Sequence, residues 1–110
     1  MATAYVPEAG DIVWLQLDPQ AGHEQVGRRP AVVLSPAGYN GRVGMMLCCP
    51  TTTRIKGYPF EVAIAGSRPS VVLADQVKCQ DWGARQAKRK GRVSPDELAQ
   101  VRAKLKALIG

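Results

Sequence analysis

Apolar residues in this chain gather in short runs, and Gly, Pro, Asp or Asn separate one run from the next. The runs occupy residues 11–17, 31–35, 44–50, 60–65 and 70–74, and a more polar run follows at 75–80. Short runs bounded by turn residues are typical of the strands of a barrel or sandwich. We therefore predict a mainly β, barrel-like fold. A chain of 110 residues can bury one core, so residues 1–110 are predicted to form a single domain.

The last part of the chain changes to the spacing of a helix. Ser94, Pro95 and Glu97 supply an N-cap, a proline at the first helical position and a capping-box glutamate. The apolar residues that follow recur three or four positions apart, at Leu98, Val101, Leu105 and Leu108. This spacing predicts an amphipathic C-terminal helix that covers one end of the barrel.

The sequence shows no sign of a membrane or secretory segment. Residues 1–8 have no basic region followed by an apolar run, and no stretch approaches the roughly 18 apolar residues of a membrane span. The cysteines are odd in number, and the adjacent Cys48 and Cys49 would point to opposite faces of a strand. We expect a cytoplasmic protein with no membrane partner, in which Cys48, Cys49 and Cys79 are reduced apolar fillers.

The net charge of +6 lies mostly in the C-terminal part of the chain. Residues 81–110 hold eight Lys or Arg and three Asp or Glu, a net +5, whereas residues 1–80 hold seven and six, a net +1. Much of the excess comes from Arg85, Lys88, Arg89, Lys90 and Arg92. Such a patch attracts phosphates or an acidic protein segment. Charges also protect a solvated edge strand from aggregation, so both interpretations stay open.

Residues 22–30 place a carboxylate, an imidazole, an amide and two guanidiniums in one glycine-flanked stretch. Apolar runs lie on both sides, so we expect these charged residues to occupy a loop between two strands. Loops held by a rigid scaffold often carry chemistry. His23 is expected to be exposed and without a catalytic role.

The residue types favour phosphate chemistry without a cofactor. A lone His23 and an adjacent cysteine pair give no zinc spacing, and no phosphate-binding glycine loop or nucleophile elbow is present. Phosphate-binding residue types do recur, at Arg28, Arg29, Thr51, Thr52, Thr53, Arg54 and Lys56. RNA carries its own 2′-hydroxyl nucleophile, so Glu24, Arg29 and Thr52 would suffice for its cleavage. Each residue alone also has an ordinary structural interpretation, such as an ion pair or a strand end.

Six segments in a fixed order extend this hypothesis over most of the chain. They are residues 10–14 (GDIVW), 22–25 (GHEQ), 29–36 (RPAVVLSP), 50–52 (PTT), 56–62 (KGYPFEV) and 73–77 (LADQV). Through these segments the chain resembles the MazF/PemK toxins of bacterial type II toxin-antitoxin systems. The resemblance implies an SH3-like β-barrel with short accessory helices, a homodimer, and a MazE-like antitoxin whose acidic, flexible C-terminal segment blocks the site.

The same resemblance implies an activity and a set of site residues. The activity is sequence-specific, metal-independent cleavage of single-stranded RNA, mRNA included, that leaves 2′,3′-cyclic phosphate and 5′-hydroxyl ends. Arg29 and Thr52 match the catalytic pair of the family, and Glu24 matches a supporting acidic position. RNA contacts map onto Asn40, Lys56 and Gln76, and the basic run adds Arg85 and Lys88.

Two other functions fit the same fold. One is a DNA gyrase poison of the CcdB type, which would use a protein-binding C-terminal tip rather than an Arg/Thr site. The other is an SH3-like module that binds RNA without cutting it.

Overall fold

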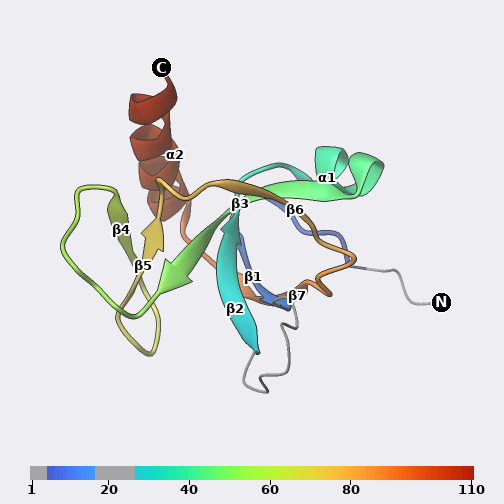
Figure 1. Ribbon diagram of the computed structural model, residues 1–110, viewed down its shortest axis with the longest axis horizontal. Coiled ribbons are helices and arrows are strands. Elements are labelled where there is room, and N and C mark those ends of the chain that lie inside the picture. Colours follow the sequence, from blue (N-terminus) through green and yellow to red (C-terminus); the bar gives the residue numbers. More distant parts are fainter. Residues whose placement is uncertain (1–4, 17–26) are drawn as a thin grey trace.

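The computed structural model describes residues 5–16 and 27–110. Within them the chain forms strands and helices in the following order (Figure 1). They are β1 (Asp11–Gln16), β2 (Arg28–Val33), α1 (Ala37–Val43), β3 (Met45–Thr52), β4 (Glu61–Ile64), β5 (Ser70–Leu73), β6 (Lys78–Asp81), β7 (Lys88–Arg92) and α2 (Pro95–Ile109). The predicted mainly β fold with a C-terminal helix is confirmed. Neither described helix is long and apolar enough to cross a membrane.

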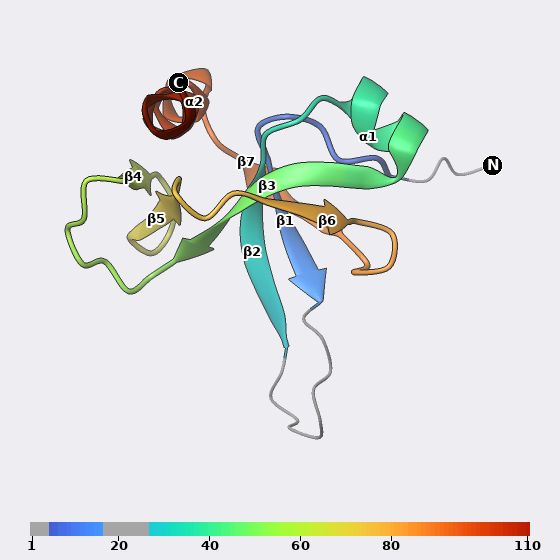
Figure 2. The ribbon, with the colours of Figure 1, turned by 45° about the horizontal axis from the view of Figure 1, so that its top comes forward.

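The strands form one antiparallel sheet in the order β4-β5-β3-β2-β1-β7, and β6 pairs with β3 outside this path. β3 joins the two halves of the sheet, because its first residues pair with β6 and its last two, Thr51 and Thr52, pair with β5. Its other edge pairs with β2, with Ala31 opposite Pro50. Figure 2 shows β4 and β5 beside one end of β3, close to α2, with α1 near the other end. The sheet is therefore a curved half-barrel, open between β4–β5 and β1–β2.

The central strands are buried on both faces. Val13 and Leu15 of β1 join one apolar cluster, whereas Ile12 joins the other. The same alternation separates Cys48 from Cys49, which lie in different clusters, as the sequence predicts. Alternate side chains of a strand point to opposite faces, so one strand can serve two cores.

Helix α2 begins as the sequence predicts. Ser94 is the N-cap, and it closes a capping box with Glu97: Glu97 N donates to Ser94 Oγ at 3.0 Å, and Ser94 N donates to Glu97 Oε1 at 2.8 Å. Val101 on its inner face is fully buried in the larger cluster, against which Leu98 and Leu105 also pack. The helix contacts β4 and so supports one side of the opening in the half-barrel.

One strand boundary and the burial of one cysteine differ from the prediction. β2 begins at Arg28 rather than near residue 31, so the expectation that Arg28 and Arg29 lie in a loop is wrong: they pair with Gln16 and Leu15. The apolar-run criterion missed this start because both side chains are exposed. Cys79 is also exposed, so the expectation of an apolar filler holds for Cys48 and Cys49 alone.

The charged run at residues 88–92 forms β7, an edge strand paired with β1. This placement agrees with the interpretation of the basic run as a solvated edge. A buried carboxylate ties this edge to β1: Asp11 Oδ1 accepts from Arg92 Nη1 at 2.8 Å, and Arg89 Nε lies 3.6 Å from the same oxygen. Tyr5 and the Glu8 backbone N–H donate to Asp11 Oδ2, so the carboxylate also fixes the segment before β1.

Candidate active site

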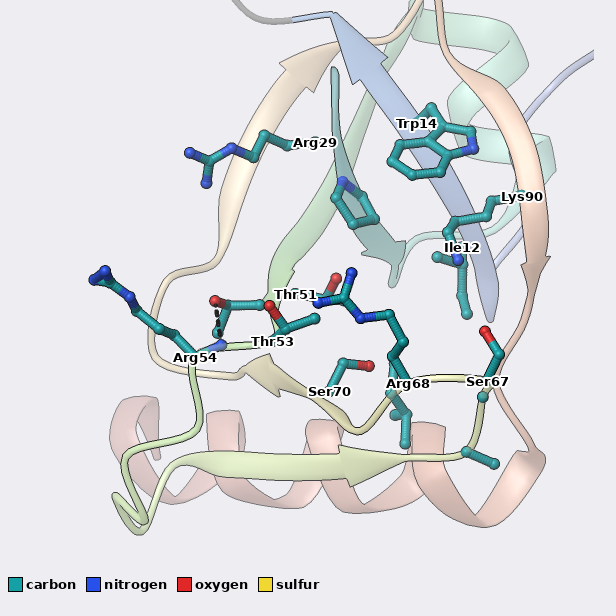
Figure 3. Close-up of a pocket in the computed structure, with 15 residues that line it drawn as sticks. Ile12, Trp14, Arg29, Thr51, Thr53, Arg54, Ser67, Arg68, Ser70 and Lys90 are labelled. Atoms are coloured by element: carbon teal, nitrogen blue, oxygen red, sulfur yellow. Dashed lines mark hydrogen bonds between the residues drawn. The ribbon is translucent and has the colours of Figure 1, made fainter. Parts of the chain in front are cut away.

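The opening of the half-barrel holds a cavity of about 730 Å³ (Figure 3). One wall comes from β1 and β2 with Trp14, Arg29 and Pro30, and the floor comes from the end of β3. The opposite wall is the β4–β5 connection, residues 65–69, with Ser70 at its end. Lys90 of β7 completes the lining. Strands far apart in sequence thus converge on one space.

The lining of this cavity is cationic. Arg29, Arg54, Arg68 and Lys90 contribute four positive side chains, and the described lining contains no Asp or Glu. Hydroxyl groups from Thr51, Thr52, Thr53, Ser67 and Ser70 lie among them. None of the three guanidiniums pairs with a carboxylate of the described residues, so they are available to bind phosphate by paired hydrogen bonds. The cavity is therefore suited to an anionic ligand.

The hydroxyl group of Thr52 can donate a hydrogen bond to a ligand. The Arg54 backbone N–H donates to Thr52 Oγ1 at 3.0 Å, which Figure 3 marks. Because a threonine hydroxyl has one proton and two acceptor lone pairs, this contact leaves the proton free for a ligand oxygen. The side chain is half-buried at the end of β3, where pairing with Val71 fixes the backbone.

A smaller cavity of about 210 Å³ adjoins the first and shares Thr52 and Arg54 with it. Its lining brings together Lys56 and Gln76, both expected to contact RNA, with Asp75. The aromatic rings of Tyr58 and Phe60 also line it. Glu61 holds the preceding turn, because its carboxylate accepts from the Lys56 N–H at 3.1 Å and the Gly57 N–H at 2.9 Å. This second cavity has both a stacking surface and polar edges, as a nucleobase would require.

Trp14 and Arg68 line the cavity although neither was expected at the site, and Lys90 was expected only as part of the basic run. The cations of Arg28 and Lys90 lie 5.0 and 5.3 Å from the Trp14 ring centroid, so this indole carries a cationic flank. Trp14 alternates with Ile12 and Gln16 on one face of β1, and this mixture of apolar and polar residues was a signal for its place in the site. Arg68 lies in a connection that carries no motif, and only the fold brings it to the cavity.

The expectation that Asn40 contacts RNA disagrees with the structure. It is fully buried in α1, and its side chain is fully used within the protein. Its amide nitrogen donates to the carbonyl oxygens of Pro7 and Ser35 at 2.8 and 2.9 Å, and its Oδ1 accepts from Ser35 Oγ at 2.6 Å. An amide engaged in this way ties α1 to the segment before β1 and cannot reach RNA from this position.

Two expected residues that the structure describes, Arg85 and Lys88, line neither cavity. Lys88 is opposite Trp14 on β7, and Arg85 precedes this strand, where its Nε donates to Gln80 Oε1 at 3.0 Å. Glu24 lies outside the described residues. Among the described residues, no three His, Cys, Asp or Glu side chains come together as a metal site would require. Of the expected residues, Arg29 and Thr52 line the main cavity, and Thr52, Lys56 and Gln76 line the smaller one.

Fold and cavity together define a class of protein: a small, basic β half-barrel with a cationic groove. Comparison with known proteins narrows the class. The profile of the PemK-like, MazF-like toxins of type II toxin-antitoxin systems matches residues 8–109. The chain is 55% identical to the endoribonuclease toxin MazF of Escherichia coli, over the full length of both. It is 38% identical to the endoribonuclease toxin ChpB of the same species, over 93% of each. This protein therefore belongs to the PemK/MazF toxin family.

Solved structures agree with this assignment. The structure superposes on that of a MazE-MazF complex from Deinococcus radiodurans with a TM-score of 0.91 at 54% sequence identity, covering 97% of this chain and 98% of the other. A Mycobacterium tuberculosis MazF toxin at 18% identity still gives a TM-score of 0.72 over 90% of this chain and 95% of that one, which shows the fold alone.

Proposed function

We propose that this protein is the endoribonuclease toxin of a toxin-antitoxin pair, and that it cleaves single-stranded RNA in the groove between β1–β2 and β4–β5. The observation that carries the proposal is the cavity that joins Arg29 and Thr52 among four cations, with no acidic residue in its described lining. Full-length identity of 55% to an endoribonuclease toxin supports it. Cleavage of cellular mRNA in the cytoplasm would stop translation and growth.

The proposed reaction uses the substrate's own nucleophile. The 2′-hydroxyl of the nucleotide before the scissile bond loses its proton to a base and attacks the adjacent phosphorus. A 2′,3′-cyclic phosphate forms while the bond to the 5′-oxygen breaks, and that oxygen leaves as a hydroxyl after taking a proton. Glu24 is the candidate base. An arginine stays protonated in proteins, so Arg29 is better suited to stabilise the charge of the transition state and to donate to an oxygen.

Thr52 and the second cavity complete the proposed site. The free hydroxyl proton of Thr52 would bind a non-bridging oxygen of the scissile phosphate. Lys56 and Gln76 would contact the neighbouring nucleotide in the smaller cavity, which opens beside Thr52. Arg85 and Lys88 would contact RNA that extends beyond the groove.

The proposed partners are a second copy of the chain and an acidic antitoxin. Solved MazE-MazF complexes of close structural similarity support an antitoxin partner. An extended acidic segment would enter the cationic groove and exclude RNA by occupying the same phosphate-binding groups. If the protein is a homodimer, light scattering should give twice the mass of one chain.

A direct test incubates the purified protein with a long mixed-sequence RNA in excess EDTA. We expect cuts at a limited set of sites, with cyclic phosphate ends, and none from Arg29→Ala protein. Binding without any cleavage would favour an RNA-binding module. An Arg29→Ala variant that still arrests growth and traps gyrase on DNA would favour a gyrase poison.

A further inference from the structure

The wall of the main cavity opposite Arg29 carries a further cation, the side chain of Arg68. Arg68 lies in the connection between β4 and β5, and its side chain is exposed. Figure 3 shows it extending from this connection toward the middle of the cavity, whereas Arg29 and Arg54 extend along the other side. No Asp or Glu of the described residues pairs with Arg68, and Lys90 shares the cavity with it. Its guanidinium is therefore available to an anion.

The connection that carries Arg68 is tied to helix α2. The Ala65 backbone N–H, at the start of the connection, donates to Glu97 Oε2 at 2.8 Å. The other oxygen of the same carboxylate accepts from the Ser94 N–H in the capping box. At the far end, Ser70 pairs with Ile64 in the sheet. Glu97 thus joins the first turn of α2 to the cavity wall, with one oxygen for each.

The cations of this cavity stand on opposite walls. Arg29 and Thr52 lie on the β2–β3 side, and Arg68 reaches in from the opposite wall. A single-stranded RNA has a phosphate at every nucleotide, so a strand seated at Arg29 and Thr52 must carry its next phosphates past the other groups of the groove. A guanidinium at the opposite wall would fix the direction of the strand.

We propose that Arg68 is the centre of a second phosphate-binding subsite, which binds a non-scissile phosphate of the RNA, and that Glu97 is its positioning residue. The proposal rests on the function proposed above, because it names a further part of the same RNA-binding groove. Arg68 holds the strand so that the scissile phosphate meets Arg29 and Thr52. Glu97 acts through the Ala65 N–H and does not touch RNA.

The test is a binding measurement with a non-cleavable RNA, in which a 2′-deoxy nucleotide replaces the one that supplies the attacking hydroxyl. Arg68→Ala should weaken binding about tenfold, the scale of one charge-assisted contact. The plot of log affinity against log salt should become shallower by about 0.7, the loss of one phosphate contact on a single strand. Arg42→Ala is the matched control, because Arg42 is exposed on α1, lines neither cavity and removes the same charge.

Single neutral methylphosphonates placed along the RNA locate the contact. One non-scissile position should cost affinity in the wild-type protein and nothing further in Arg68→Ala, whereas the effects add at every other position. Coupling at the scissile phosphate alone, or at none, overturns the proposal. If wild-type protein cuts RNA while Arg68→Ala behaves like Arg42→Ala, the second subsite is wrong and the proposed function stands. If wild-type protein neither binds nor cuts RNA, the proposed function itself fails.

A second pair of variants separates the positioning of the Arg68 connection by Glu97 from the capping of α2 by the same residue. Ser94→Ala removes the capping hydroxyl but keeps the Glu97 carboxylate on the Ala65 N–H. Glu97→Ala removes the contacts of the carboxylate with the Ala65 and Ser94 N–H groups and keeps the Ser94 hydroxyl on the backbone N–H of residue 97. Glu97→Ala should weaken RNA binding severalfold, and Ser94→Ala should not, at matched fractions of folded protein. In an Arg68→Ala background the Glu97→Ala change should have no further effect on binding. An equal loss in both backgrounds would contradict positioning through Arg68.

Discussion

Arg29 and Thr52 are brought together by the pairing of β2 with β3, and their surroundings give them different tasks. Arg29 is exposed at the start of β2 and supplies charge. Thr52 is half-buried and supplies a hydroxyl whose lone pair is already engaged by Arg54 N. The proposed reaction would therefore lose a positive charge when Arg29 is replaced and a hydrogen-bond donor when Thr52 is replaced.

Replacing Arg29 by Ala should lower RNA cleavage by at least roughly a hundredfold, because the charge that stabilises the transition state is lost. Single-turnover rates at saturating protein measure this loss without the contribution of binding. Arg42→Ala controls for the change in net charge and should cut at the wild-type rate. A rate within a few fold of wild type for Arg29→Ala would remove this residue from the mechanism.

The three cysteines differ in burial, and their reactivity should follow. Burial raises the pKa of Cys48 to about 11 and that of Cys49 to about 12, so both remain thiols at neutral pH. Cys79 is exposed on β6. Since the thiolate is the nucleophile, brief alkylation of native protein at pH 7.5 (about one unit below the ordinary thiol pKa) should modify Cys79 alone. Mass spectrometry counts the adducts, and native protein labelled quickly at Cys48 or Cys49 would contradict this burial.

Sequence reasoning singled out Arg29, Thr52, Lys56 and Gln76, which line the two cavities, because their residue types and motif positions are local properties. Asn40 failed for a reason that no local pattern contains. Whether an amide faces a ligand or the interior depends on what packs over it, and here the segment before β1 supplies the acceptor, the Pro7 carbonyl oxygen. Arg68 was missed for the converse reason, since its place in the groove follows from the turn between β4 and β5.

At the scale of elements, the start of α2 was predicted from consecutive residues, whereas the start of β2 was missed and a strand at residues 88–92 was only one of two interpretations. The start of α2 follows from Ser94, Pro95 and Glu97, whose contacts lie within one turn. The start of β2 and four of the five residues of β7 are exposed and charged, and hydrogen bonds to β1 on either side make these segments strands. A hydrophobic pattern cannot report a strand that the neighbouring strand imposes.

The capping box of α2 should make stability depend on pH in the acid range. The hydrogen bond from the Ser94 N–H to its carboxylate lowers the pKa of Glu97, and the Ala65 N–H acts in the same direction. A carboxyl whose folded pKa is below its unfolded value stabilises the protein above the unfolded value. This stabilisation is lost as pH falls through the folded pKa.

The melting temperature of wild-type protein should therefore fall on acidification below about pH 4.3, the ordinary pKa of a glutamate. Glu97→Gln should give a shallower dependence measured by circular dichroism from neutral pH downward. Some dependence should remain in the variant, because hydrogen bonds from the Ala37 and Ala9 N–H groups also lower the pKa of Glu8. An identical pH profile for the two proteins would show that the Glu97 carboxylate does not stabilise α2.

At the scale of the whole molecule, the net charge of +6 is distributed so that positive side chains line the groove and continue along the β7 edge. Lys90 belongs to both, because it lies on β7 and lines the main cavity. Asp11 neutralises part of this edge by pairing with Arg92 and Arg89, and so leaves Lys88 and Lys90 as its available cations. The proposed RNA surface would then include the edge strand, so the two interpretations of the basic run are compatible.

This arrangement predicts that RNA affinity falls linearly with salt on logarithmic axes. Lys88→Gln should reduce the slope by about 0.7 if Lys88 contacts one phosphate of the single strand. Lys106→Gln, on the exposed side of α2, is the matched control and should leave the slope unchanged. Fluorescence anisotropy with the non-cleavable RNA measures both. Equal slopes for wild type and Lys88→Gln would mean that this lysine only protects the edge of the sheet.

The central claim is that the half-barrel holds RNA so that its own 2′-hydroxyl attacks the neighbouring phosphate between Arg29 and Thr52. The most direct measurement compares two oligonucleotides that contain a site the protein cuts, one all-RNA and one with a single 2′-deoxy nucleotide on the 5′ side of that bond. The account predicts cyclic phosphate and 5′-hydroxyl fragments from the first and an intact second strand that still binds. Cleavage of the deoxy strand at a comparable rate, or 5′-phosphate products from either strand, would contradict it.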